Sequence, residues 1–183
     1  ILYWNMSFLR TGTGGLTAQA FGRKDWEKVM DIFSQGIATA LATAMVCIAV
    51  QWLYAELCFL IIPCSTQVEV IAREYFFTRI WAVPATLSLF VFRGWFIGMQ
   101  NTLYSMVVDV YVNIANGFAG WFLAFHTPLG IRGISVGVLI AQWSGLVLAS
   151  VLMGFKYGHL LRHFSIRRSL KWQYIRHFFT INV

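Results

Sequence analysis

The chain has 183 residues, of which 58% are hydrophobic, 17% aromatic and only 11% charged, and its mean hydropathy is +0.66. Because a soluble domain carries about 25% charged residues, this composition excludes an ordinary soluble globular domain and a disordered chain. The net charge of +7 is typical of nucleic-acid-binding proteins, but here the basic residues flank long apolar segments. We therefore predict an all-α integral membrane protein, a polytopic helix bundle whose partner is the lipid bilayer and not nucleic acid.

The apolar segments predict one partial and four complete membrane-spanning helices. In chain order, the partial helix covers residues 1–20 and the complete spans cover residues 32–60, 76–99, 103–125 and 133–156. A helix needs about 20 apolar residues to cross a bilayer, and these segments are about twice as long as a membrane β-strand and lack its alternating pattern. Pro84 lies inside the second complete span, which we expect to kink or begin there because proline removes a backbone hydrogen bond.

Polar segments separate these spans. We expect a basic turn at Phe21–Lys28, a longer and more acidic loop at Pro63–Glu74, and short turns at residues 100–102 and 126–132. Ten of the 14 Lys and Arg residues fall on one side of the alternating spans, and the positive-inside rule places that side in the cytoplasm. We therefore predict a multi-pass protein of the cell inner (plasma) membrane. Its tail after residue 156 should be cytoplasmic, with an interfacial amphipathic helix over residues 157–179.

One stripe of polar residues is the candidate for a substrate or cation pathway. Asp109, Asn113, Asn116 and Gly120 recur at spacings of four, three and four residues, which places them on one face of the third complete span. A charged aspartate at the middle of a membrane helix costs about 2.5–3.5 kcal/mol on insertion scales, so this face should look into the bundle or a water-filled cavity. The alternative for the asparagines is hydrogen bonding between helices. The alternative for Asp109, near the cytoplasmic end of its span, is exposure to water.

Two residues of the preceding span are candidates for a hinge or a gate. Arg93 lies at the cytoplasmic end of that span, where it could form a gating ion pair or extend to lipid phosphate groups. Pro84 could act as a hinge or produce a static kink. The Gly-x-x-x-Gly motifs at residues 94–98 and 133–137 predict closely packed helices. The sequence shows no catalytic set and no convincing group of metal ligands, so we expect neither a catalytic nor a metal site.

Three stretches resemble the multidrug and toxic compound extrusion (MATE) family, its DNA-damage-inducible F type: Phe8–Gly22, Arg79–Thr102 and Gly130–Gln142. Their order and spacing are similar to that family from late in its second helix to the start of its seventh, in a twelve-helix transporter built of two lobes. The resemblance implies a fragment of the amino-terminal lobe, with the remainder of the same polypeptide as its partner. It also implies secondary-active efflux of small organic, often cationic, compounds in exchange for protons or sodium ions, without enzymatic activity and without a cofactor.

The chain departs from the family pattern at two positions. Gly120 stands where many members carry an acid, and Val138 stands where a threonine is often found. Both changes remove oxygen ligands that a hard cation needs, so we expect coupling to depend on parts outside this chain or on Asp109 as a proton carrier. One alternative function is a lipid-linked sugar flippase of the same superfamily, which should line its cavity with several arginines. Another is a membrane-embedded transferase, which would need clustered acids or histidines at one membrane face.

Overall fold

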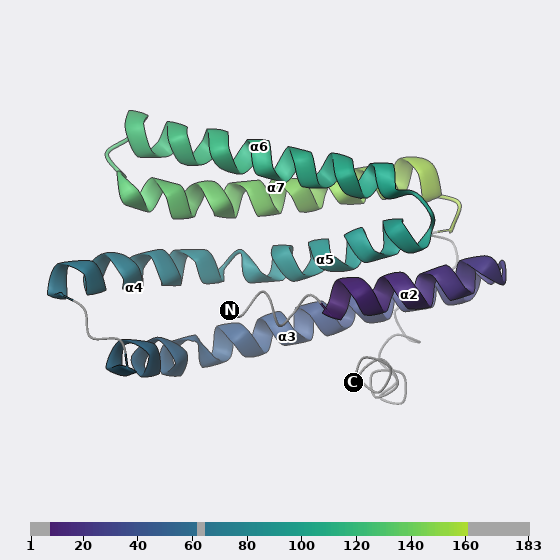
Figure 1. The fold of residues 1–183 in the computed structure, drawn as a ribbon, viewed down its shortest axis with the longest axis horizontal. Coiled ribbons are helices and arrows are strands. Elements are labelled where there is room, and N and C mark those ends of the chain that lie inside the picture. The colour runs from purple at the N-terminus through teal and green to yellow at the C-terminus, as the bar shows by residue number, and fades with distance from the viewer. Residues whose placement is uncertain (1–7, 62–64, 161–183) are drawn as a thin grey trace.

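The computed structural model describes residues 8–61 and 65–160. Six helices run through these two ranges (Figure 1): α2 (Phe8–Gly22), α3 (Trp26–Ile61), α4 (Thr66–Ile80), α5 (Val83–Gly98), α6 (Thr102–His126) and α7 (Ile131–Tyr157). Neither range contains a strand, which confirms the prediction of an all-α polytopic bundle. The predicted amphipathic helix at 157–179 lies outside the described residues from residue 161 onward, as do the first seven residues of the predicted partial helix.

Three helices in the described part of the chain, α3, α6 and α7, are each long and apolar enough to cross a membrane. α4 and α5 meet the same criterion together, as a pair bent by 50° at a short break. In chain order, the four predicted complete spans therefore correspond to α3, the α4–α5 pair, α6 and α7. The basic turn before α3 is shorter than expected, because α2 ends at Gly22 and α3 already begins at Trp26.

The acidic loop predicted at Pro63–Glu74 is wrong for most of its length. α4 begins at Thr66 and continues through Glu74. Glu69 lies in its first turn and Arg79 in its last, and both charges stabilise a helix because they oppose the partial charges at its two ends. The low hydropathy of this segment therefore marks the polar half of a broken span and not a loop.

The break between α4 and α5 confirms the expected effect of Pro84. The backbone N–H of Ala82 donates to the carbonyl oxygen of Arg79 at 3.0 Å. α5 then begins at Val83, with Pro84 in its first turn. A proline is tolerated there because the first N–H groups of a helix have no partner within it. The chain thus starts a new helix at the proline, in a direction bent away from α4.

α2 packs in parallel against α5 at backbone distance. A Cβ atom added at Gly94 would lie 2.3 Å from the carbonyl oxygen of Arg10, and one added at Gly98 would lie 2.6 Å from the Cβ of Thr17. No side chain larger than hydrogen fits at either glycine in this arrangement. The first predicted Gly-x-x-x-Gly contact is therefore confirmed, and it brings Arg10 beside the segment that carries Arg93.

α6 and α7 form an antiparallel pair with the same kind of contact. A Cβ atom at Gly133 would lie 2.6 Å from the carbonyl carbon of Leu123, and one at Gly137 would lie 2.6 Å from the backbone nitrogen of Gly120. The second glycine motif is thus also confirmed as a packing motif. Gly120, which belongs to the predicted polar stripe, lies buried in this contact.

The core is centred on α5, whose Trp95 and Phe96 are fully buried. The Trp95 ring meets Phe33 of α3 and Tyr157 of α7 edge to face. Its indole N–H also donates to the carbonyl oxygen of Val29 at 3.3 Å. Aromatic packing of this kind is worth about 0.5–1.5 kcal/mol per pair beyond the area it buries. α5 is therefore held from several sides, and the residues beside Trp95 have fixed positions.

The turns between helices gather at the two ends of the bundle, as Figure 1 shows. The α2–α3 turn, the α5–α6 turn and the end of α7 lie together at one end, and the end of α3, the start of α4 and the α6–α7 turn lie at the other. We call the first the basic end, because it carries Arg23, Lys24, Lys28 and Lys156. We call the second the far end.

Candidate functional site

Two of the predicted site residues, Arg93 and Asp109, form an ion pair between α5 and α6. The Nε atom of Arg93 and the Oδ1 atom of Asp109 lie 2.6 Å apart. Arg93 lies five residues before the end of α5 and Asp109 seven residues after the start of α6. Because a short turn joins these antiparallel helices, residues at similar distances from the turn face one another. Both charges lie about 7–10 Å from the helix ends, at 1.5 Å per residue.

The pair is partly sheltered by protein. The Arg93 side chain is 13% exposed and the Asp109 side chain 38% exposed. The Arg93 guanidinium also lies 5.9 Å from the centre of the Phe90 ring, a distance at which a cation is attracted to the ring face. The N–H of Arg93 Nε is not aligned for a hydrogen bond, so the contact is a close ion pair and not a directed hydrogen bond. The structure thus places Arg93 beside an acid of the neighbouring helix, and its role in a gate stays a prediction.

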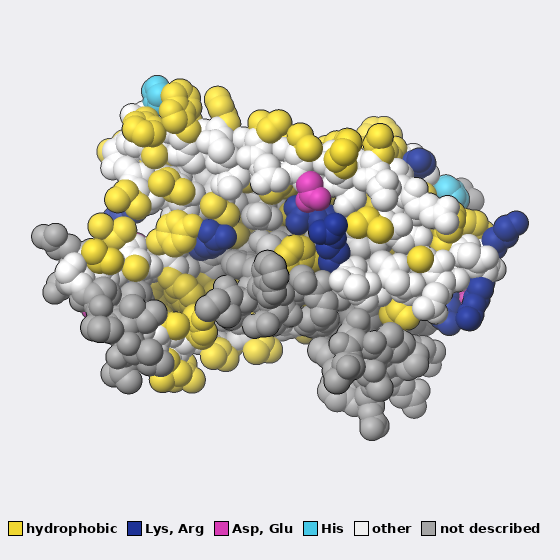
Figure 2. Space-filling view, in the orientation of Figure 1, with side chains coloured by type: hydrophobic (Ala, Val, Ile, Leu, Met, Phe, Trp, Pro, Cys, Tyr) yellow, Lys and Arg dark blue, Asp and Glu magenta, His cyan; other side chains and the backbone are white. Residues whose placement is uncertain are grey.

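The surroundings of the pair add a second positive charge. The backbone of Arg10 on α2 packs on Gly94, and the charge of Arg10 acts on Arg93. Figure 2 shows basic side chains gathered beside an acidic one near the middle of the visible face, among hydrophobic groups. A cation that binds to this carboxylate must therefore compete with arginine charges that are already close to it.

Different helices pack against the polar stripe of α6 along its length. Arg93 of α5 lies against Asp109, and Ile134 and Gly137 of α7 lie against Gly120. Asn113 lies exposed between them, and its side-chain amide donates to the backbone oxygen of Asp109 at 2.8 Å. Asn116 is half-buried. The structure therefore joins Asp109 to Arg93 and leaves Asn113 open on the same face. The proposed role of Asn113 and Asn116 in a pathway stays a prediction, as does that of Pro84 in a hinge.

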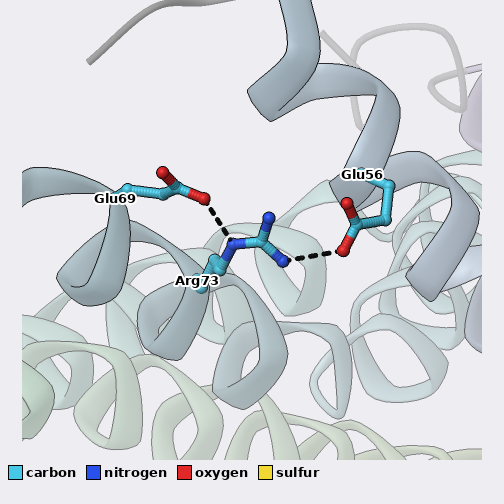
Figure 3. Close-up of polar contacts among 3 residues, drawn as sticks. All are labelled: Glu56, Glu69 and Arg73. Carbon is cyan, nitrogen blue, oxygen red and sulfur yellow. Dashed lines mark hydrogen bonds and ion pairs between the residues drawn. The ribbon is translucent and has the colours of Figure 1, made fainter. Parts of the chain in front are cut away.

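A second charged set lies at the far end and was not predicted (Figure 3). Arg73 of α4 lies between two carboxylates, with its Nη1 atom 3.0 Å from Glu56 of α3 and its Nε atom 2.9 Å from Glu69 of α4. The i, i+4 spacing of Glu69 and Arg73 could have indicated this contact on a helix. The segment was expected to be a loop, so the signal was missed.

The neighbour of Arg73 in the sequence, Glu74, points to α7. It forms an ion pair with Arg132, in the first turn of that helix. An open groove with a volume of about 490 Å³ lies between α4 and α7, and it is lined by Arg73, Glu74, Phe77, Thr78, Trp81, Arg132 and Leu139. The carbonyl oxygen of Trp81 accepts a hydrogen bond from the indole N–H of Trp143 at 3.2 Å. The charged residues of the groove lie toward the far end of the bundle, and Trp81 and Leu139 lie farther from it along α4 and α7.

Comparison with known proteins agrees with this architecture. Residues 1–125, well over half of the chain, match the MatE family model. DNA damage-inducible protein F of Escherichia coli (strain K12) is 26% identical over 152 residues, which are 83% of this chain and 33% of that protein. The chain thus spans about a third of the length of this curated relative.

Two solved structures share the fold. The inward-facing conformation of a multidrug resistance MATE family transporter of the MOP superfamily superimposes with a TM-score of 0.84 at 15% identity, over 97% of this chain and 40% of that one. The crystal structure of the eukaryotic MATE transporter AtDTX14 superimposes with a TM-score of 0.82 at 21% identity, over 97% of this chain and 39% of that one. Together with the match to the family model, these findings confirm the resemblance stated from the three sequence stretches. The chain belongs to the MatE family, whose members are transporters and not enzymes.

Proposed function

We propose that the protein containing this chain exports small organic, often cationic, compounds from the cell by antiport against protons or sodium ions. This chain would supply part of the amino-terminal lobe, from late in the second helix to the start of the seventh. The basic end would face the cytoplasm and the far end the outside of the inner (plasma) membrane, in keeping with the positive-inside rule. Family membership and the bundle of apolar helices support this function.

The observation that carries the proposal is the Arg93–Asp109 pair. The Asp109 carboxylate lies within a candidate membrane span, and its side chain is 38% exposed. It is held by the guanidinium of Arg93, whose side chain is 13% exposed. Ionisable residues inside membrane helices are costly, and they most often mark ion or substrate pathways. A carboxylate can bind a proton or a cationic group but not both at once. Competition at Asp109 would therefore couple proton entry to cation exit.

The energy available to such an exchange is sufficient for efflux. One charge crossing a potential of 100 mV releases about 2.3 kcal/mol. Because 1.4 kcal/mol corresponds to a factor of ten, one charge could maintain roughly a fiftyfold gradient of substrate. Asn113, exposed one turn along α6 from Asp109, would then lie on the path that the substrate takes.

The test uses the complete gene product in a host that lacks its own efflux pumps. We expect export of a fluorescent organic cation that stops when a protonophore is added, or that requires sodium in the buffer. Export that is indifferent to both would exclude antiport. Absence of export, with the protein confirmed in the membrane, would favour the lipid-linked flippase.

The role of Asp109 is tested separately by the Asp109→Asn variant. We expect the dependence of export on external pH to flatten, because the amide cannot take up a proton. Glu27→Gln is the matched control, since Glu27 lies in the first turn of α3 at the basic end and outside the Arg93–Asp109 pair. An unchanged pH profile in Asp109→Asn would remove Asp109 from the coupling mechanism and leave the family function intact.

A further inference from the structure

Lys156, in the last turn of α7, lies against two aromatic rings at the basic end. Its ammonium nitrogen is 5.0 Å from the centre of the Tyr104 ring on α6 and 5.9 Å from the centre of the Tyr157 ring. At these distances a cation is attracted to the face of an aromatic ring. The rest of the ammonium's surroundings are open, since Lys156 is exposed. The protein therefore presents a positioned cation where the α5–α6 turn and the end of α7 meet (Figure 1).

Both rings are themselves fixed by the core of the bundle. The Tyr104 ring meets the fully buried Phe96 edge to face. The Tyr157 ring meets the fully buried Trp95 in the same way, and its hydroxyl oxygen accepts a hydrogen bond from the side-chain amide of Asn101 at 3.1 Å. A free lysine side chain loses much rotamer freedom when it binds a ligand. Because the two rings already restrain this ammonium, it loses less freedom on binding.

Within the described residues, no acid is paired with this ammonium. All seven Asp and Glu residues of the chain lie in the described ranges, and the ion pairs that they form there do not include Lys156. The sequence that follows is also basic, since residues 157–183 contain five Lys and Arg residues and no Asp or Glu. Basic clusters directly after a membrane helix are typical of proteins that bind anionic lipids. The charge of this end of α7 therefore calls for an anionic partner.

An apolar surface extends from the ammonium toward the middle of the bundle. Val107 and Tyr111 lie three and seven residues after Tyr104, on the same face of α6, and both are exposed. On α7, Phe155 lies next to Lys156 in the sequence and is exposed as well. A free inorganic anion would leave this apolar surface unused. A phospholipid has a phosphate for the ammonium and acyl chains for the apolar surface.

We propose that Lys156 and the Tyr104 face of α6 form a binding site for an anionic phospholipid. Its phosphate lies at the Lys156 ammonium, and an acyl chain lies along Val107 and Tyr111. A zwitterionic head group fits less well, because its own ammonium group already balances its phosphate. The cytoplasmic leaflet is the one that supplies anionic lipids to a basic membrane end. The inference rests on the proposed function only for the cytoplasmic orientation of the basic end, and not on transport.

The test measures lipid binding to the complete gene product in detergent by native mass spectrometry. The probes are dioleoylphosphatidylglycerol, which is anionic, and dioleoylphosphatidylcholine, which is zwitterionic. We expect the anionic lipid to bind about fivefold more tightly, and Lys156→Gln to weaken its binding about fivefold and abolish the preference. Lys156→Arg should keep the affinity within about twofold, because a guanidinium also packs on aromatic rings. Tyr104→Leu should weaken binding about two- to threefold, because one of the two rings that position the ammonium is lost.

Lys24→Gln is the matched control. Lys24 is an exposed lysine of the same basic end, in the α2–α3 turn beside Asp25, and lies outside the contact of Lys156 with its two rings. Its replacement should change the affinity by less than about twofold. If Lys24→Gln and Lys156→Gln weaken binding equally, the attraction belongs to the basic end as a whole and the proposal is overturned.

Two other results would also overturn the proposal. One is an unchanged affinity and preference in Lys156→Gln. The other is displacement of the lipid by an equal concentration of inorganic phosphate, since the site would then take a free anion and not a lipid. The expected binding pattern in a protein that exports nothing would instead refute the proposed function and leave the lipid site standing.

Discussion

Replacing Gly94 by alanine should separate α2 from α5 and destabilise the bundle. The added Cβ atom would lie 2.3 Å from the carbonyl oxygen of Arg10, where ordinary van der Waals contact begins at 3.4 Å. The neighbour is backbone and cannot rotate away, so the two helices must move apart by about 1 Å at this point. Overpacking of this kind typically costs about 1–3 kcal/mol.

The control is Gly117→Ala on α6, where an added Cβ atom meets nothing within 4 Å. Both substitutions gain the same helix propensity, about 1 kcal/mol, so this gain cancels when the two variants are compared. We expect Gly94→Ala to be less stable than Gly117→Ala by about 1–3 kcal/mol.

The assay is reversible unfolding of the complete gene product in mixed micelles, titrated with sodium dodecyl sulfate and followed by tryptophan fluorescence. Trp95 is fully buried and lies next to Gly94 on α5, so its emission should report the separation of the helices. Equal stability of the two variants would show that α2 and α5 do not approach at backbone distance, and the geometry that places Arg10 beside Arg93 would be lost with it.

Four further substitutions test other parts of the structure. Asp109→Asn and Arg93→Gln should each destabilise the bundle by about 1–3 kcal/mol, less than the 3–5 kcal/mol that is lost when a fully buried pair is broken. The double variant should lose less stability than the sum of the two single losses. Additive losses in unfolding titrations would mean that the pair contributes nothing. Trp143→Phe should lower stability by about 0.5–1.5 kcal/mol in the same titration, because it removes the hydrogen bond to the Trp81 carbonyl oxygen. An unchanged stability would indicate that water replaces this hydrogen bond. Pro84→Ala should lower stability by no more than about 1 kcal/mol and leave the export rate unchanged, since the proline occupies the first turn of α5; a large loss of export at normal stability would make Pro84 a hinge.

The features predicted from sequence are those that depend on short segments. Apolar length is a property of each helix alone, so the spans at α3, α6 and α7 could be identified. The break at Pro84 follows from the chemistry of one residue. The Gly-x-x-x-Gly motifs predict a close approach by any partner helix, although the sequence did not indicate which helix would pack on each.

The charged contacts could not be predicted in the same way, because their partners are distant in the chain. Glu56 and Arg73 are 17 residues apart, and Glu74 and Arg132 are 58 residues apart. Counting charges by side of the membrane treats each residue alone and cannot show which of them pair. Arg93 and Asp109 lie on either side of one short turn, and their similar distances from it were a usable signal. The choice between lipid phosphate and Asp109 as the partner of Arg93 nevertheless depended on how α5 and α6 pack.

The pairing of charges also explains why one of the spans is broken. α4 carries four charged residues within 15 positions, a composition that could not face lipid without a large cost for each unpaired charge. Ion pairs to α3 and α7 hold Arg73 and Glu74, and these contacts require α4 to lean toward those two helices. α5 is instead apolar and mostly buried in the core. A straight helix could not satisfy both sets of partners, so the 50° bend lets each half of the span pack in the surroundings that its own residues require.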